Sequence, residues 1–447
     1  MGFSTLFSDD SLTATEQGIN PGGELPRRLI AAGTAALFVA AILGPLITLF
    51  GVGPYRVFLF RLYFPVYLIV AGWALWTDRI LVPSLPAAVW ALVGIGAYAA
   101  VSAFWATDLS RMLFELFTLL SGVFVAITVV VTATDEWTLS YYLLCVFGLV
   151  AIGEVVALIE IFTGYHLPTS RLLVKRVPAR DTVIGVDAAS AWFHNRNNFG
   201  FFLGLVSGPL FAYGLDKRRD RRLRVVCVVG AWLALVIVVA NGSRIATAAI
   251  LLSLVVIVVV GGLRHRIGPV PHSHREIIVT IGLVFFVALF VIVVVTLVPN
   301  PFMPRGARSL WTRWQLGVAG VELLARTGGI GVGVGNVQSA LHQLAAVSTG
   351  GAFVLHNWMF YFLSGYGIVG GGLFLTAYAL VLYELAVKAL STTGTLYLGL
   401  FGMFVGFPVG ALGPSNAVLT HSFWVFFGLA AAAAYQLGLA RSSKSAK

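Results

Sequence analysis

A histidine followed by an asparagine, His356 and Asn357, opens an otherwise aromatic and aliphatic segment of the chain. Histidine changes its charge near neutral pH, which suits a side chain that takes or gives a proton. The segment predicts a short helix over residues 357–366 that ends at Gly367, because glycine readily takes the left-handed conformation that closes a helix. A long apolar run follows, so we expect His356 at the mouth of a membrane bundle.

Two arginines have types and positions that suit anion binding. Arg244 closes a four-residue turn, 241–244, between two apolar runs. A turn this short places Arg244 at the level of lipid headgroups, where it either anchors the helix or points into the bundle and holds a phosphate. Arg313 lies in a stretch that predicts a helix on the outer face, where it either faces solvent or binds the same anion.

The end of the polar loop 163–196 is dense in hydrogen-bonding side chains. Asn197 or Asn198 is expected to cap the helix that follows. His194 and Arg196 are candidates for reaching a ligand, although capping is the favoured explanation for this cluster.

Other patterns exclude several kinds of chemistry. The glycine-rich stretch 328–336 lacks the lysine and hydroxyl residue of a nucleotide-binding P-loop, so we interpret it as mainly structural. No His, Cys, Asp or Glu cluster has metal-ligand spacing, and no carboxylate pair of a glycosidase is evident. We therefore expect neither a metal nor a cofactor.

The composition places these residues in a membrane protein. Of 447 residues, 59% are hydrophobic and 11% are charged, whereas soluble chains carry about a quarter charged residues. The apolar runs are continuous rather than alternating, which predicts helices and not a membrane barrel. Cys145 and Cys227 both fall inside apolar runs, so they indicate no disulfide framework. The first apolar run, from about residue 29, is too long for a cleavable signal peptide.

The apolar runs predict an all-α bundle of about twelve transmembrane helices, with a large extracytoplasmic loop that contains short helices. The predicted regions are a tail at 1–28, spans one to nine within 29–298, the large loop at 299–368, spans ten to twelve within 369–440, and a tail at 441–447. The spans are expected at 29–50, 57–76, 80–103, 112–133, 139–162, 198–215, 225–240, 245–263, 277–298, 369–390, 396–412 and 419–439.

Basic residues predict the orientation of the bundle. Segment 216–224 carries six basic residues in nine positions, and the positive-inside rule assigns it to the cytoplasm together with both termini. Loops 163–197, 241–244 and 299–355 then lie on the outer face. They still carry many cations, Arg308 among them, with few acids nearby. Because the cytoplasmic loops account for much of the net charge of +11, that charge does not indicate binding of nucleic acid. The cations of the outer loops do indicate an anionic partner.

Four motifs, taken in order, resemble those of the bacterial O-antigen ligase and polymerase family. His356-Asn357, nine residues and then Gly367-x-x-Gly370 resemble the histidine motif of that family. Ser243-Arg244 resembles its turn between two spans, and Arg313-Trp314 with the following glycines resembles the opening of its large outer loop. Asn195-Arg196-Asn197 resembles its Asn-Pro-Asn start of a span, with Arg196 in place of proline. The specific resemblance covers about residues 190–375.

This resemblance implies a glycosyltransferase of the bacterial plasma membrane that needs neither metal nor nucleotide. The family moves a glycan from a polyprenyl (undecaprenyl) diphosphate carrier to an acceptor hydroxyl on the extracytoplasmic face, with inversion. By resemblance, Arg244 and Arg313 would bind the diphosphate and His356 would act as general base. Asn357, Arg196, His194 and Arg308 would contact substrate. The implied partners are the lipid-linked donor, a lipid A-core or other glycan acceptor, and membrane lipid.

Several functions stay open from the sequence. A ligase and a polymerase differ only in the acceptor, and no sugar-specific pocket can be identified in the loops. A lipid-carrier flippase or transporter would place polar or broken helices near the membrane midplane, whereas most spans here are apolar at their centres. A structural partner without chemistry would tolerate the loss of His356 and Arg313.

Overall fold

The computed structural model describes residues 21–46, 48–52, 55–77, 85–173, 187–267, 306–344, 355, 357–414 and 417–445. Continuous apolar runs form helices here because a helix satisfies backbone hydrogen bonds within its own segment. The helices are α1 (Pro21–Leu43), α2 (Leu59–Trp76), α3 (Ala87–Val101), α4 (Leu109–Thr132), α5 (Glu136–Thr163), α6 (Arg196–Leu215), α7 (Arg221–Ala240), α8 (Arg244–Ile267), α10 (Gly306–Arg326), α11 (Val337–Gln343), α12 (Trp358–Ser391), α13 (Thr395–Gly410) and α14 (His421–Ser445). Single 3-10 turns lie at η3 (Gly44–Leu46), η4 (Ser102–Phe104), η5 (Arg171–Leu173) and η7 (Ala417–Leu419).

The chain is a multi-pass membrane protein by the length and composition of its helices. In the described part, seven helices are long and apolar enough to cross a membrane, namely α3 with η4, α4, α5, α6, α7, α8 and α12. Shorter apolar helices lie within α1, α2, α13 and α14. Each of these helices overlaps a predicted span, while predicted span 277–298 lies outside the described residues. The count of about twelve therefore stays a prediction.

An antiparallel hairpin follows α1 where the sequence predicts continued helix. Strand β1 (Thr48–Val52) pairs with β2 (Tyr55–Phe58), with an irregular register between Thr48 and Phe50. The prediction of one span over 29–50 is therefore wrong beyond Leu43. The physical reason is the pair Gly44-Pro45, since proline removes a backbone donor and disfavours helix in the residue before it.

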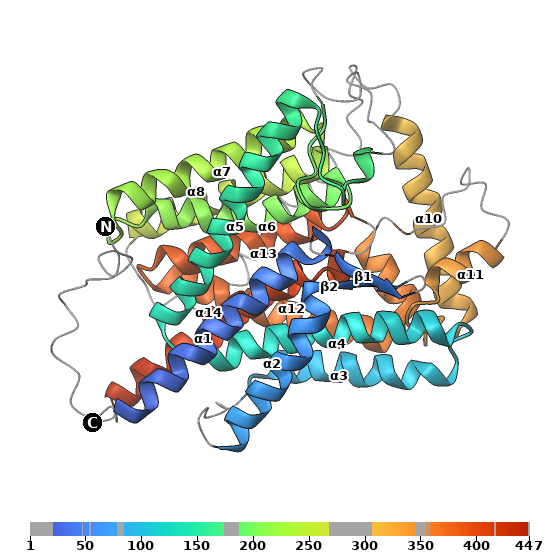
Figure 1. Ribbon diagram of the computed structural model, residues 1–447, viewed down its shortest axis with the longest axis horizontal. Coiled ribbons are helices and arrows are strands. Elements are labelled where there is room, and N and C mark those ends of the chain that lie inside the picture. Colours follow the sequence, from blue (N-terminus) through green and yellow to red (C-terminus); the bar gives the residue numbers. More distant parts are fainter. Residues whose placement is uncertain are drawn as a thin grey trace.

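Helix α13 lies at the centre of the bundle, packed against α6, α8 and α12 (Figure 1). Glycines let its backbone approach its neighbours closely. A Cβ added at Gly402 would lie 2.9 Å from the Ser253 carbonyl of α8, and one at Gly399 would lie 2.9 Å from the Pro209 Cα of α6. Small residues at such positions favour tight association of helices in membranes.

Helix α12 contains the predicted break at Gly367. Its φ of 65° and ψ of −174° separate a short first segment, Trp358 to Tyr366, from the long remainder. The glycine-rich stretch docks on this break: Gly329 accepts a hydrogen bond from the Ile368 amide, and the Val332 amide donates to the Ser364 carbonyl, both at 2.8 Å. The predicted short helix and its glycine stop are thus confirmed.

The loops predicted to be cytoplasmic meet at one end of the bundle. Arg219, in the basic segment before α7, donates to the Ser140 hydroxyl at 3.1 Å and lies 3.5 Å from the Glu136 carboxylate at the start of α5. Arg264, near the end of α8, donates to the carbonyl of Thr392 after α12 at 2.7 Å. These contacts join segments that the charge pattern assigns to the same side.

The loops predicted to be outside meet at the opposite end, near α10 and α11 in Figure 1, and we call it the outer end after that prediction. The side-chain oxygen of Asn336 accepts from the Asp108 amide at 2.7 Å, so the glycine-rich stretch contacts the turn between α3 and α4. The Trp105 indole donates to the Gly331 carbonyl at 3.1 Å. The Trp192 indole donates to the Ile42 carbonyl at the end of α1 at 3.0 Å. Loops that are predicted to lie on the same side of the membrane are therefore found at the same end of the bundle.

Replacing Gly367 with alanine should destabilise the protein strongly. A positive φ with ψ near 180° is a conformation that essentially only glycine adopts, at a cost of ~1–3 kcal/mol for other residues, and the new Cβ would collide with the Ile330 carbonyl. Gly372 is the matched control, because its Cβ would meet nothing within 4 Å and it lies in the same helix. We expect Gly367→Ala to lower the unfolding temperature in detergent and Gly372→Ala to leave it unchanged or raise it. Equal melting of the two variants would contradict the docked break.

Cysteine labelling tests the assignment of the two ends. In a variant without Cys145 and Cys227, a cysteine at exposed Tyr165 should react with a membrane-impermeant maleimide in right-side-out spheroplasts. A cysteine at exposed Lys217 should react only after the membrane is opened. Labelling of both positions from outside, or the reverse pattern, would refute the orientation.

Candidate functional site

The turn that carries Arg244 is a helix end closed by Gly242. Gly242 has a φ of 64°. Its amide donates to the Val239 carbonyl at 2.9 Å, and the Ser243 amide donates to the Val238 carbonyl at 3.1 Å. This pair of bonds satisfies the last carbonyls of α7 and reverses the chain within three residues. Arg244 is then the half-buried first residue of α8.

Arg196 lies against the same turn. Its Nη1 donates to the Asn241 carbonyl at 2.9 Å. Close packing of α6 on the turn makes this possible, because a Cβ on Gly200 would lie 3.0 Å from the Ala246 Cβ and 3.3 Å from the Ser243 hydroxyl. Arg196 and Arg244 therefore begin two neighbouring helices at the outer end.

The start of α6 differs from the prediction in its capping residue. The Asn195 side-chain oxygen accepts from the Asn197 and Asn198 amides at 3.0 and 2.9 Å. Asn195 is the cap, and the prediction of Asn197 or Asn198 is wrong, because the helix begins at Arg196, two residues before the predicted start at 198. His194 is exposed, and its carbonyl accepts from the Arg171 amide at 2.8 Å, which ties it to η5.

Asn357 caps α12 immediately after the predicted catalytic histidine. Its side-chain oxygen accepts from the Met359 amide at 3.0 Å and from the Phe360 amide at 3.4 Å. This bonding explains an asparagine at that position without a ligand. His356 itself lies outside the described residues, between buried Leu355 and half-buried Asn357.

Arg308 and Arg313 both fall within α10, as the outer helix predicted for Arg313 requires, and their side chains lie outside the described part. Helix α10 packs on the short first segment of α12. A Cβ on Gly317 would lie 3.0 Å from the Phe360 ring, and the Ser364 hydroxyl donates to the Gly320 carbonyl at 2.9 Å. Residue 313 is one helical turn before this contact.

Helix α13 connects these segments at the outer end. The Trp358 indole donates to the Pro408 carbonyl of α13 at 3.3 Å. The Phe407 ring of α13 lies 5.5 Å from the Trp358 ring and 6.1 Å from the Phe201 ring of α6. The start of α12, directly after His356, thus shares one packed end with the starts of α6 and α8.

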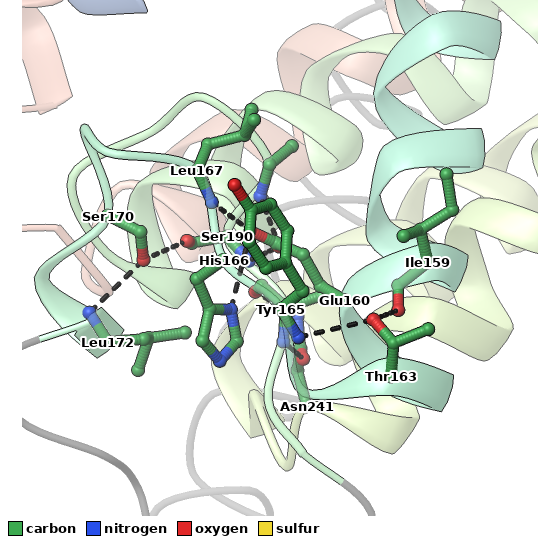
Figure 2. A network of polar contacts seen from close by, with 12 residues as sticks. Ile159, Glu160, Thr163, Tyr165, His166, Leu167, Ser170, Leu172, Ser190 and Asn241 are labelled. Carbon is green, nitrogen blue, oxygen red and sulfur yellow. Dashed lines mark hydrogen bonds and ion pairs between the residues drawn. The ribbon is translucent and has the colours of Figure 1, made fainter.

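Two buried carboxylates hold this end together, and sequence reasoning missed both. Glu115 of α4 accepts from the Tyr361 hydroxyl at 2.5 Å and from the Tyr366 hydroxyl at 3.0 Å. Glu160 of α5 accepts from backbone amides of the loop before α6, as Figure 2 shows. An acid inside an apolar run was the available signal, since a carboxylate there needs a partner.

The described part of the chain brings two arginines close together and gathers no cluster of metal-ligating side chains. In that part of the chain, no group of three or more His, Cys, Asp or Glu side chains could hold a metal ion. The arrangement offers instead two half-buried arginines at neighbouring helix starts, where the helix dipoles also favour an anion.

Comparison with known proteins finds a distant relative. No family model matches the chain. It is 27% identical over 253 residues to the teichuronic acid biosynthesis protein TuaE of Bacillus subtilis (strain 168). The match covers 54% of this chain and 51% of that protein, so the chain spans about half the length of the curated relative it matches.

Removing the hydroxyl of Tyr366 should destabilise the short segment of α12. Tyr366→Phe takes a donor from the buried Glu115 carboxylate, which loses a hydrogen bond it cannot replace with water, at a cost of ~1–3 kcal/mol. Tyr165→Phe is the control, because Tyr165 is 68% exposed. We expect a lower unfolding temperature in detergent for Tyr366→Phe alone. An unchanged temperature would show that the bond from Tyr366 to Glu115 does not stabilise this segment.

Proposed function

We propose that this protein is a membrane glycosyltransferase that transfers a glycan from a polyprenyl-diphosphate carrier to an acceptor hydroxyl on the outer face. The observation that carries the proposal is the shared outer end: the starts of α6 and α8, each with an arginine, pack around α13 with the segment that follows His356. These three segments are far apart in the sequence, and each carries one of the motifs described above.

The proposed reaction is a single displacement. The acceptor oxygen attacks the anomeric carbon while the bond from that carbon to the carrier diphosphate breaks, which inverts the carbon. His356 takes the proton of the acceptor hydroxyl as general base. The electron pair of the broken bond leaves with the diphosphate, whose growing charge Arg244 and Arg313 stabilise. The hydrogen bond from Arg196 to the turn of Arg244 supports a contribution of Arg196 to the same anion site.

The acceptor is proposed to be a lipid-linked core or a growing glycan chain. The motifs favour a ligase of the O-antigen type. The name of the matched relative concerns the biosynthesis of teichuronic acid, a polysaccharide, which supports a role in polysaccharide biosynthesis and is compatible with either activity. The two activities give different products in one assay: a ligase adds one glycan to a separate lipid acceptor, whereas a polymerase yields a ladder of carrier-linked chains.

A lipid-carrier flippase is the alternative from another class. It calls for broken helices near the midplane of the membrane. The break within α12 instead lies at Gly367, nine residues after Trp358 and close to the predicted outer face. This position supports a surface site rather than a pathway through the bundle.

Substitutions at the proposed site test the reaction directly. The assay uses purified protein, EDTA and lipid-linked glycans extracted from the source cells. His356→Ala should lower turnover by about 10²- to 10⁴-fold, which is the usual contribution of a general base. Arg244→Ala should lower turnover by about 10²- to 10³-fold, as expected for one lost contact to developing charge.

Arg326→Ala is the control for a general effect of charge. Arg326 is an exposed arginine of α10 that pairs with Glu322 at 2.6 Å. We expect its removal to change turnover less than twofold. Full turnover by folded His356→Ala would eliminate the general-base assignment. Absence of glycan transfer, together with carrier movement across vesicles, would favour the flippase.

A further inference from the structure

Glu160 is a buried acid at the outer end that has no part in the proposed chemistry but binds a loop there. Glu160, in the last turn of α5, is 1% exposed. One of its oxygens accepts from the Ser190 and Ala191 amides at 2.7 and 2.8 Å. The other lies 3.4 Å from both the Leu167 amide and the His166 Nδ1. Burial of such a group is favourable only when its oxygens are bonded, and here backbone donors supply the bonds (Figure 2).

The loop that Glu160 binds contains a residue in an unfavourable backbone conformation. Ala191 has a φ of 46°, the only positive value for a non-glycine residue in the described part of the chain. This conformation is unfavourable for a residue with a Cβ. The amide of Ala191 and that of Ser190 both point at the same carboxylate oxygen, so Glu160 stabilises the strained turn.

The same loop is hydrogen-bonded to the turn that carries Arg244. The Ala189 amide donates to the Asn241 side-chain oxygen at 2.7 Å, and the Asn241 side-chain amide donates back to the Ala189 carbonyl at 2.9 Å. Asn241 is fully buried, and its own carbonyl accepts from Arg196. Hydrogen bonds thus run from Glu160 through residues 189–191 and Asn241 to Arg196, and Asn241 is also the first residue of the turn that carries Arg244.

We propose that Glu160 is a positioning residue that fixes Arg196 and Arg244 for diphosphate binding by holding the 189–191 loop against Asn241. The ligand in this statement rests on the proposed function, whereas the mechanical link does not. Arginine binds phosphate well only when its planar fork is already oriented, so a loose turn would weaken binding without removing either guanidinium.

If Glu160 supports the turn that carries Arg244, weakening the bonds of Glu160 should speed amide exchange in that turn. Glu160→Gln keeps the size of the side chain but replaces the charged acceptor with a neutral one, which weakens the bonds to the loop. Glu154→Gln is the matched control, because Glu154 is a second buried acid of α5 and its Oε1 has no hydrogen-bond partner among the described residues. In hydrogen–deuterium exchange of the full protein, Glu160→Gln should speed exchange in residues 189–191 and 241–244, and Glu154→Gln should not. Unchanged exchange at 241–244 would overturn the link whatever the ligand.

Binding tests the consequence with undecaprenyl diphosphate as the probe and undecaprenol as the control for lipid contact. We expect Glu160→Gln and Asn241→Ala each to raise the Kd for the diphosphate about 5- to 20-fold, and Glu154→Gln to change it less than twofold. Combining either change with Arg244→Ala should add little, because groups that act as a unit are not additive. If the change at Glu160 or Asn241 weakened binding by a route independent of Arg244, its effect on Kd would add in full to that of Arg244→Ala.

The outcomes separate the two proposals. If the wild-type protein binds undecaprenyl diphosphate no better than undecaprenol, the proposed function fails, while the exchange data still decide the link. If the wild-type protein binds the diphosphate tightly and Glu160→Gln binds it equally well, the positioning role is wrong and the proposed function stands.

Discussion

Backbone that leaves a helix inside an apolar protein must still find hydrogen-bond partners, and this requirement shapes the outer end of the bundle. Buried side chains meet it at each place where a loop folds inward. Glu160 bonds the loop before α6, Asn241 bonds the same loop from the other side, and Asn336 bonds the turn between α3 and α4. These polar side chains therefore stabilise the fold at this end, independently of any role in chemistry.

The centre of the bundle meets the same requirement differently. Helices α6, α8 and α13 satisfy their backbones internally and gain their stability from close approach at glycines. Such packing transmits position rigidly, because a side chain added at Gly399 or Gly402 would collide with a neighbouring backbone. The starts of α6 and α8 are thus held relative to the end of α13, and Trp358 attaches the start of α12 to that same end.

Sequence patterns predicted those features that depend on local chemistry. Continuous apolar runs predicted the helices, Gly367 predicted the break in α12, and basic segments predicted which loops meet. The hairpin after α1 was missed, because its strands are as apolar as a span and a short apolar run has no distinct period. The acid inside an apolar run indicated that Glu160 needs a partner, but no local pattern identifies the distant amides of residues 190 and 191 as that partner. The side chains of His356, Arg308 and Arg313 lie outside the described residues, and their proposed roles still rest on the motifs.

The two buried acids divide the proposed site into parts with separate supports. Glu160 acts on the arginine turn through α5 and the loop before α6, whereas Glu115 acts on the segment after His356 through α4 and two tyrosines. The two supports belong to different helices, so the proposed diphosphate binding and the proposed proton transfer should be open to separate weakening. If the proposed function holds, a site divided in this way could vary its acceptor side, near the start of α12, while the arginine side stays constant. That division is what a set of enzymes with one type of lipid carrier and many acceptors would require.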